Sequence, residues 1–282
     1  MVVYGVEKKW KATVSLFEYL AQYAVAGTMS AWMIDEGKIL DHRIIEPHSD
    51  KMAVQAFLKG RELVKQEGKE DEAMAALTKA IQKYERHAQA YERRGYINFQ
   101  LQNYEDALYD FTKSINIHDN NPDAYFGRAN IYLLKAELEK AVLDFDRTVK
   151  RSIPLQSIYW KARRIKGDCL LKLGDAKGAA EEYKFFTRRK FSQEDPNFRW
   201  KKDVFNRYGK VLLELGDFKE AISAFNSAME MEVNDGKEAN ADELLHRGIA
   251  LHRAGQKGFK SDWKKAAAMG SKKAQELMEA HA

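Results

Sequence analysis

The stretch AYERRGY at residues 90–96 returns as AYFGRAN at 124–130, and YEDALYDF at 104–111 returns as LEKAVLDF at 138–145. Both pairs are separated by 34 residues and share small, aromatic and apolar residues at matching places. A fixed period of this length predicts a repeated supersecondary unit that buries its apolar face against its neighbours. We therefore expect an array of such units.

The same landmarks run along most of the chain and mark six copies of the repeat. The first landmark is a small residue, at Gly60, Gly95, Ala129, Gly167, Gly209 and Gly248. The second is an alanine, and it is followed in several copies by an aromatic residue: Ala73, Ala107, Ala141, Ala179 and Ala221, with Phe111, Phe145 and Phe225. This pattern resembles the tetratricopeptide repeat, with a degenerate sixth copy. The resemblance implies an all-α fold, a right-handed superhelix of paired helices over residues 51–282.

Small residues at these positions have a physical purpose. Two helices approach each other closely only where one of them lacks a large side chain. Gly95 is therefore expected to face Ala107, and Gly167 to face Ala179. All four prolines fall between the repeats, where they interrupt no predicted helix.

Residues 1–50 do not follow the repeat and are expected to form a separate element. Apolar side chains at helical spacing predict an amphipathic helix over residues 6–26. The alternating residues 29–33 and the apolar run 39–45 flank a glycine-containing turn, which indicates a β-hairpin. Polar residues interrupt the apolar stretch near the start, so we expect no signal peptide and a cytoplasmic location.

Composition argues against several classes of protein. The chain has 282 residues, a net charge of +5 and one cysteine. This charge is small for a dedicated nucleic-acid binder, and one cysteine builds neither a disulfide framework nor a cysteine-based zinc site. No apolar run is long enough for a membrane span. Cys169 stands where other repeats have aliphatic residues, so we expect an inert core thiol.

No arrangement typical of catalysis is found in the sequence. It has no nucleophile elbow, no metalloprotease motif and no catalytic dyad. The segment GQKGFKS at 255–261 lacks the spacing of a phosphate-binding loop, and the seven histidines are scattered. We therefore expect no enzymatic activity, no cofactor and no metal site.

One basic segment suggests another function. Residues 188–202 combine lysines and arginines with aromatic residues. One interpretation is a patch that binds RNA or an acidic partner. The other is a solvated connection whose lysines cover apolar surface. Glu194 and Asp195 dilute the positive charge, which favours the second interpretation and argues against nucleic-acid binding.

The resemblance also implies where a partner would bind. In tetratricopeptide repeats, the first helix of each pair lines the inner surface of the superhelix. Carried over to this chain, the positions are Phe57, Arg61, Glu92, Tyr96, Phe99, Phe126, Asn130, Arg164, Asp168 and Lys210. The earlier positions are mainly aromatic and the later ones charged. Aromatic side chains of this kind suit the anchoring of a peptide.

One subclass of the family grips the acidic C-terminus of heat-shock chaperones with a carboxylate clamp. Asn130 matches the clamp's middle asparagine, and Arg164 stands at the place of a later cation. Glu92 and Tyr96 occupy the first pair, however, and Asp168 replaces the last arginine. A carboxylate would meet like charge there, so we do not expect this ligand.

The sequence favours a non-catalytic scaffold or adaptor that binds a peptide or a partner protein on the inner surface. A second hypothesis is a structural subunit of a larger assembly, with the inner surface filled by a fixed neighbour or by residues 1–50. The third is an RNA-associated helical repeat protein. Repeats are generic platforms, so the fold alone does not separate the first two hypotheses.

Overall fold

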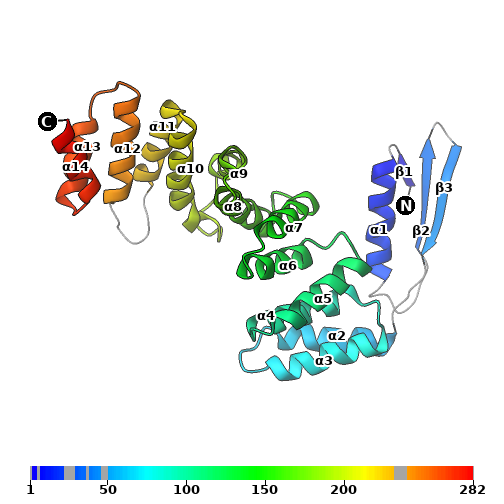
Figure 1. Cartoon of the computed structure of the whole chain (residues 1–282). Helices are drawn as coiled ribbons and strands as arrows, with labels where there is room; N and C mark the ends of the chain where they lie inside the picture. Colours follow the sequence, from blue (N-terminus) through cyan, green and yellow to red (C-terminus); the bar gives the residue numbers. More distant parts are fainter. Residues whose placement is uncertain are drawn as a thin grey trace. The chain divides into compact units, whose positions relative to one another are not determined.

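The computed structural model describes residues 2–4, 7–21, 29–35, 38–45, 50–231 and 240–281. Within these residues the chain forms three strands, one 3-10 helix and fourteen α-helices (Figure 1). In chain order they are β1 (Val2–Tyr4), α1 (Glu7–Ala21), β2 (Met29–Asp35), β3 (Lys38–Ile45), α2 (Lys51–Leu63), α3 (Glu70–Lys83), α4 (Ala88–Gln100), α5 (Tyr104–Ile117), α6 (Pro122–Leu134), α7 (Leu138–Arg151), α8 (Ser157–Lys172), α9 (Ala176–Arg188), η1 (Phe198–Trp200), α10 (Lys201–Leu215), α11 (Phe218–Glu230), α12 (Ala241–Arg253), α13 (Phe259–Ala268) and α14 (Lys272–Ala280).

From α2 onward the helices follow one another as pairs, one pair for each predicted repeat. The two helices of a pair pack together, as in α2 with α3, α4 with α5, α8 with α9, α10 with α11 and α12 with α13. The α14 helix follows the sixth pair and packs on α13. The predicted all-α repeat fold is confirmed.

Short polar side chains start several of these helices. Asp50 accepts hydrogen bonds from the backbone N–H groups of Met52 and Ala53 at the start of α2. The first residues of a helix leave such groups without partners, and a capping side chain satisfies them. The same capping occurs at α9, α11, α12 and α14, from Asp175, Asp217, Asn240 and Ser271.

The small landmark glycines allow close approach, but not to the alanine: Gly60 faces Leu77, and the landmark glycines of later repeats face an aromatic ring. A Cβ atom added to Gly167 would lie 2.7 Å from Cε1 of Tyr183, a ring that follows the alanine landmark of its repeat. Gly127, which the sequence analysis did not single out, has a similar role. A Cβ atom there would lie 2.3 Å from Cζ of Phe111, which is fully buried. The rings therefore fill the space that the glycines leave.

Buried ion pairs join the two helices of several repeats, a feature that the sequence analysis missed. Arg94 on α4 donates to both carboxylate oxygens of Asp110 on α5, at 2.9 and 2.7 Å. Arg247 on α12 binds Asp262 on α13 in the same way, at 2.7 Å for both bonds. Each arginine directly precedes the small landmark residue, and each aspartate directly precedes the aromatic ring.

Other repeats vary this ion pair. In the fourth repeat, Glu182 on α9 accepts from Arg163 at 2.6 Å and from Lys166 at 2.9 Å. In the fifth, both charges are missing, and Tyr208 and Ala224 stand at the corresponding positions. The hydroxyl of Tyr208 donates instead to Glu220 at 2.8 Å.

Residues before the repeats form the predicted helix and hairpin, with one additional strand. Strands β2 and β3 pair antiparallel, with Met33 opposite Asp41, and β1 joins β2 in parallel. The indole N–H of Trp10 on α1 donates to Asp41 at 2.9 Å, which fixes the helix to the sheet. The predicted helix end at 22–26 and the centre of the turn at 36–37 lie outside the described residues.

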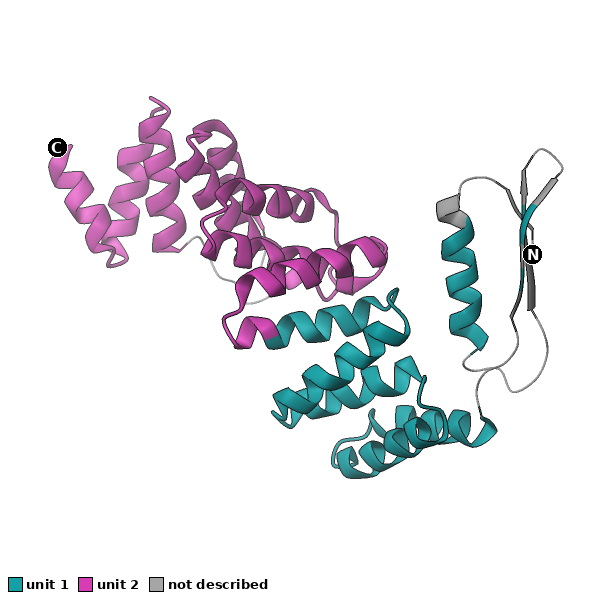
Figure 2. Cartoon of the chain, turned by 45° about the vertical axis from the view of Figure 1, so that its right-hand side comes forward, with its two compact units in different colours: residues 1–131 teal, residues 132–282 magenta. Residues whose placement is uncertain are grey.

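The chain divides into two compact units, residues 1–131 and residues 132–282, and the division falls within α6 (Figure 2). Each unit has cores of its own, centred for example on Phe57 and Leu77 in unit 1 and on Tyr183 and Phe225 in unit 2. The sequence-based division after residue 50 stays a prediction. Across the described ranges, no helix combines the length and apolar character that crossing a bilayer requires.

Candidate functional site

The ten predicted binding residues lie on the first helices of their repeats, α2, α4 and α6 in unit 1 and α8 and α10 in unit 2. The aromatic face is the set Arg61, Tyr96, Phe99, Phe126 and Asn130 in unit 1. The charged face is the set Arg164, Asp168 and Lys210 in unit 2.

The two remaining residues, Phe57 and Glu92, lie beneath the surface. The ring of Phe57 is 1% exposed and packs 4.7 Å from the ring of His87, which precedes α4. Glu92 is 3% exposed on α4 itself. The resemblance to tetratricopeptide repeats implied that Phe57 and Glu92 lie on the inner surface. In the structure both side chains are buried. Neither side chain offers area to a partner in this conformation.

Glu92 is poorly compensated for its burial. Its Oε2 lies 3.5 Å from Nε of Arg93, and its Oε1 has no hydrogen-bond partner among the described residues. Burial raises the pKa of Glu92 to about 7, because the charged form loses its hydration. Arg93 lowers this pKa, and Asp123 raises it further. The carboxyl group therefore changes between its protonated and its ionised form near neutral pH.

Neighbouring residues hold the rings of the aromatic face in place. Tyr96 is half-buried, with its ring edge-on to Phe111 at 5.1 Å and its hydroxyl donating to the carbonyl of Asp123 at 3.2 Å. Burial raises the pKa of Tyr96, so its hydroxyl stays protonated. Phe99 packs edge-on against Tyr104 at 5.7 Å. These rings are fixed in orientation and only partly covered.

The polar residues of the aromatic face differ in their availability. The amide of Asn130 donates to the backbone carbonyl of Phe126, one turn earlier on α6, at 2.7 Å. Its NH₂ group is therefore partly used within the helix. Arg61 is exposed on α2, and its Nε lies 3.6 Å from Glu62. An exposed pair of this kind contributes little to stability and opens easily.

The charged face of unit 2 is a network of internal ion pairs. The guanidinium of Arg164 lies over the ring of Trp200 at 4.3 Å, and its Nη1 lies 3.6 Å from Asp168. Asp168 is bound more closely by Arg207 at 2.6 Å, and it accepts from the hydroxyl of Tyr183 at 2.7 Å. An acidic ligand would have to displace Asp168 from both arginines.

Lys210 is paired as well. Its Nζ lies 2.5 Å from Asp242 on α12, and Nδ1 of His246 lies 3.2 Å from the same carboxylate. Charges of opposite sign thus face each other between α10 and α12. The charged face is therefore polar, and its charges are largely balanced within unit 2.

Sequence comparison identifies the repeats directly. Residues 57–122 and residues 203–234 match the profile described as "Tetratricopeptide repeat". The chain is a tetratricopeptide-repeat protein. None of the curated proteins matches it in sequence.

Solved structures share the fold of this tetratricopeptide-repeat protein. YrrB, described as a TPR protein with an unusual peptide-binding site, is 20% identical with a TM-score of 0.60, covering 73% of this chain and 99% of its own. PilF of Pseudomonas aeruginosa is 14% identical with a TM-score of 0.54, covering 82% and 98%. MamA is 18% identical with a TM-score of 0.51, covering 64% and 91%. At these identities the likeness concerns the fold.

The basic segment 188–202 connects the fourth and fifth repeats of the tetratricopeptide-repeat protein. The Nζ of Lys201 donates to the backbone carbonyl of Arg189 at 2.8 Å. Lys202 lies 3.4 Å from the buried carboxylate of Glu243. Part of the positive charge is therefore engaged within unit 2.

The thiol of Cys169 on α8 is buried. Burial raises its pKa to about 11, so the thiol stays protonated and unreactive at neutral pH. Among the described side chains, no three of His, Cys, Asp or Glu are grouped in a way that would hold a metal ion.

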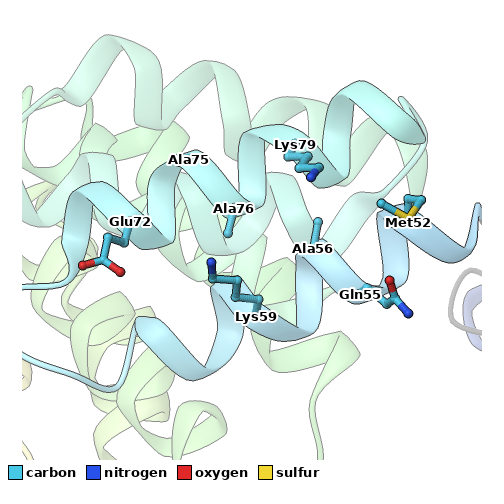
Figure 3. A pocket seen from close by; sticks show the side chains of 8 residues that line it. All are labelled: Met52, Gln55, Ala56, Lys59, Glu72, Ala75, Ala76 and Lys79. Carbon is cyan, nitrogen blue, oxygen red and sulfur yellow. The ribbon is translucent and has the colours of Figure 1, made fainter.

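A groove of about 400 Å³ lies between α2 and α3 of the first repeat (Figure 3). We call it the end groove, and none of the predicted binding residues lines it. The lining residues are Met52, Gln55, Ala56, Lys59, Glu72, Ala75, Ala76 and Lys79. The sequence did contain a signal for it: Ala56, Ala75 and Ala76 stand where the second repeat has Tyr91, Tyr109 and Asp110.

Proposed function

We propose that this tetratricopeptide-repeat protein is a non-catalytic scaffold that binds a peptide segment of a partner protein on its aromatic face. The observation that carries the proposal is the set of half-buried rings on α4 and α6, of which Tyr96 and Phe99 are held in orientation by their neighbours. Rigid aromatic side chains bind with little loss of conformational entropy and dominate many protein interfaces. YrrB, a protein of the same fold, is itself described as having a peptide-binding site.

The aromatic face is favoured over the charged face for an energetic reason. A ligand on the aromatic face covers apolar surface that is partly exposed to water. An acidic ligand on the charged face would first have to break the contacts of Asp168 with Arg207 and Tyr183. The proposal requires no cofactor and no catalytic group, and a cytoplasmic location stays a prediction of the sequence.

The test compares the full-length wild-type chain with the double variant Tyr96→Ala and Phe126→Ala as baits in cell extract. Tyr109→Ala is the matched control, because it removes an exposed ring from the same unit, on the second helix α5. We expect the double variant to lose at least one partner about tenfold or more, as quantified by mass spectrometry, and the control to keep it.

Circular dichroism must show that the double variant keeps its helicity. An unchanged partner set in a folded double variant contradicts the proposal. A partner that co-purifies in fixed stoichiometry and does not exchange would instead support the structural-subunit hypothesis.

A further inference from the structure

The end groove has a counterpart inside the molecule that shows what kind of element fits it. In the second repeat, the corresponding face of α4 is covered by α3, and Tyr91 there is buried. Arg94 on that face donates to the hydroxyl of Thr78 on α3 at 3.2 Å. In unit 2, α10 is covered by α9 and α12 by α11 in the same way. This face of a repeat is therefore a surface on which an α-helix packs.

In the first repeat, every residue that lines the end groove belongs to α2 or α3 themselves. The preceding helix, α1, uses its apolar side elsewhere. Its Trp10 packs with Phe17 and with Met33 of the sheet. Tyr19, further along α1, lies 4.7 Å from the ring of His118 at the end of α5.

The shape of the end groove follows from small side chains. Ala56 and Ala76 form its floor, at positions where the second repeat carries a tyrosine and an aspartate. Ala75 at the rim stands in place of Tyr109. These substitutions leave room for a bulky side chain supplied from outside the repeat, which would remove the apolar surface of the open groove from water.

The rim of the end groove is positively charged. Lys59 on α2 and Lys79 on α3 are exposed beside the groove (Figure 3). The single acidic residue of the lining, Glu72, is ion-paired with Lys69. A partner with carboxylates on either side of its apolar stripe would therefore be complementary. Lys11 on α1 is exposed and carries a positive charge, as the lysines of the rim do.

We propose that the end groove binds an acidic amphipathic α-helix of a partner protein. The helix packs where a preceding second helix would lie, and it inserts one bulky apolar side chain over Ala56 and Ala76. Its carboxylates lie beside Lys59 and Lys79. This site is separate from the aromatic face and does not rest on the function proposed above.

The test uses two synthetic helical peptides and the full-length protein, with binding followed by fluorescence anisotropy. The first peptide has an alanine and leucine stripe with a central phenylalanine, flanked by glutamates. The second is identical except that lysines replace the glutamates. We expect saturable binding of the acidic peptide and at least about tenfold weaker binding of the basic one. Equal affinities, or no binding of either peptide, would overturn the proposal.

Two variants assign the binding to the groove. Ala75→Tyr copies the second repeat and narrows the groove, and the pair Lys59→Glu and Lys79→Glu reverses its charge. Each should weaken the acidic peptide about tenfold. Lys83→Glu, an exposed change on the same helix, and Phe126→Ala on the aromatic face should leave binding within about twofold. Full affinity in the groove variants would overturn the assignment.

A second copy of the chain is the competing occupant. Analytical ultracentrifugation of the wild type and of the Lys59→Glu, Lys79→Glu variant separates the two cases. We expect the same sedimentation for both proteins. Self-association of the wild type that the variant abolishes would show that a second copy fills the groove, and the proposal would be wrong.

Discussion

Glu92 is a carboxyl group whose burial makes the stability of unit 1 depend on pH. Its pKa is about 7 in the folded protein against an ordinary value of 4.5. Below pH 4.5 the group is protonated in both states. As pH rises from 4.5 to 7, the unfolded chain releases its proton and the folded chain keeps it, so stability falls. Above pH 7 the loss of folding stability reaches its full size, about 3 kcal/mol, because each pH unit between the two pKa values corresponds to about 1.36 kcal/mol.

The variant Glu92→Gln should therefore be more stable than the wild type at pH 8, and the difference should disappear near pH 4.5. Urea denaturation at a series of pH values measures this. Glu85→Gln, at an exposed position, is the control and should give no such profile. A stability difference for Glu92→Gln that is independent of pH would count against buried ionisation as its cause.

Arg94 is expected to matter more than any surface arginine of unit 1. Its removal in Arg94→Ala leaves the carboxylate of Asp110, 1% exposed, without its principal partner. Breaking a buried ion pair on one side typically costs about 3–5 kcal/mol. We expect a loss of this size in chemical denaturation, against less than about 1 kcal/mol for Arg86→Ala at an exposed site.

The fifth repeat suggests a rescue of this loss. Arg94→Tyr combined with Asp110→Ala copies Tyr208 and Ala224, and Asp106 stands where Glu220 accepts the tyrosine hydroxyl. The double variant should recover most of the stability lost in Arg94→Ala, because no charge stays buried without a partner. If it is less stable than the single variant, the two arrangements are not interchangeable.

At the scale of the element, the packing of α6 on α5 depends on Gly127. In Gly127→Ala the new Cβ meets the ring of Phe111, so the two helices must separate or the ring must leave its position. Overpacking of this kind costs about 1–3 kcal/mol. Thermal unfolding of Gly127→Ala should show that loss. Adding Phe111→Leu should cost less in the Gly127→Ala background than in the wild type, and strict additivity would contradict the steric explanation.

The sequence predicted the helix pairs well, because small residues such as Gly167 and Ala179 recur once in each helix of a pair. It did not predict that the ring of Tyr183 fills the space beside Gly167. It did not predict β1, since three residues are too few for any periodicity. In the sequence the ion pair appears only as Arg94 directly before the small landmark and Asp110 directly before the aromatic landmark. That the two side chains touch follows only from the way α4 and α5 cross. Burial of Phe57 and Glu92 depends on neighbouring helices, which the pattern of a single repeat does not contain.

At the scale of the whole molecule, repeats contact mainly their neighbours, so a local change should stay local. Hydrogen exchange of Arg94→Ala, followed by mass spectrometry, should show faster exchange in α2 to α5. Exchange in α10 to α14, within unit 2, should match the wild type. Uniformly faster exchange along the chain would mean that the protein unfolds as a single cooperative body.

The burial of the only thiol has a practical consequence for observing the molecule at work. Cys169 is on α8, beneath the surface of unit 2, and its protonated form reacts slowly with alkylating reagents. A reagent such as iodoacetamide can modify it only while α8 opens. The rate at which Cys169 is labelled in the wild-type chain thus measures how often the fourth repeat opens locally, and no introduced probe is needed.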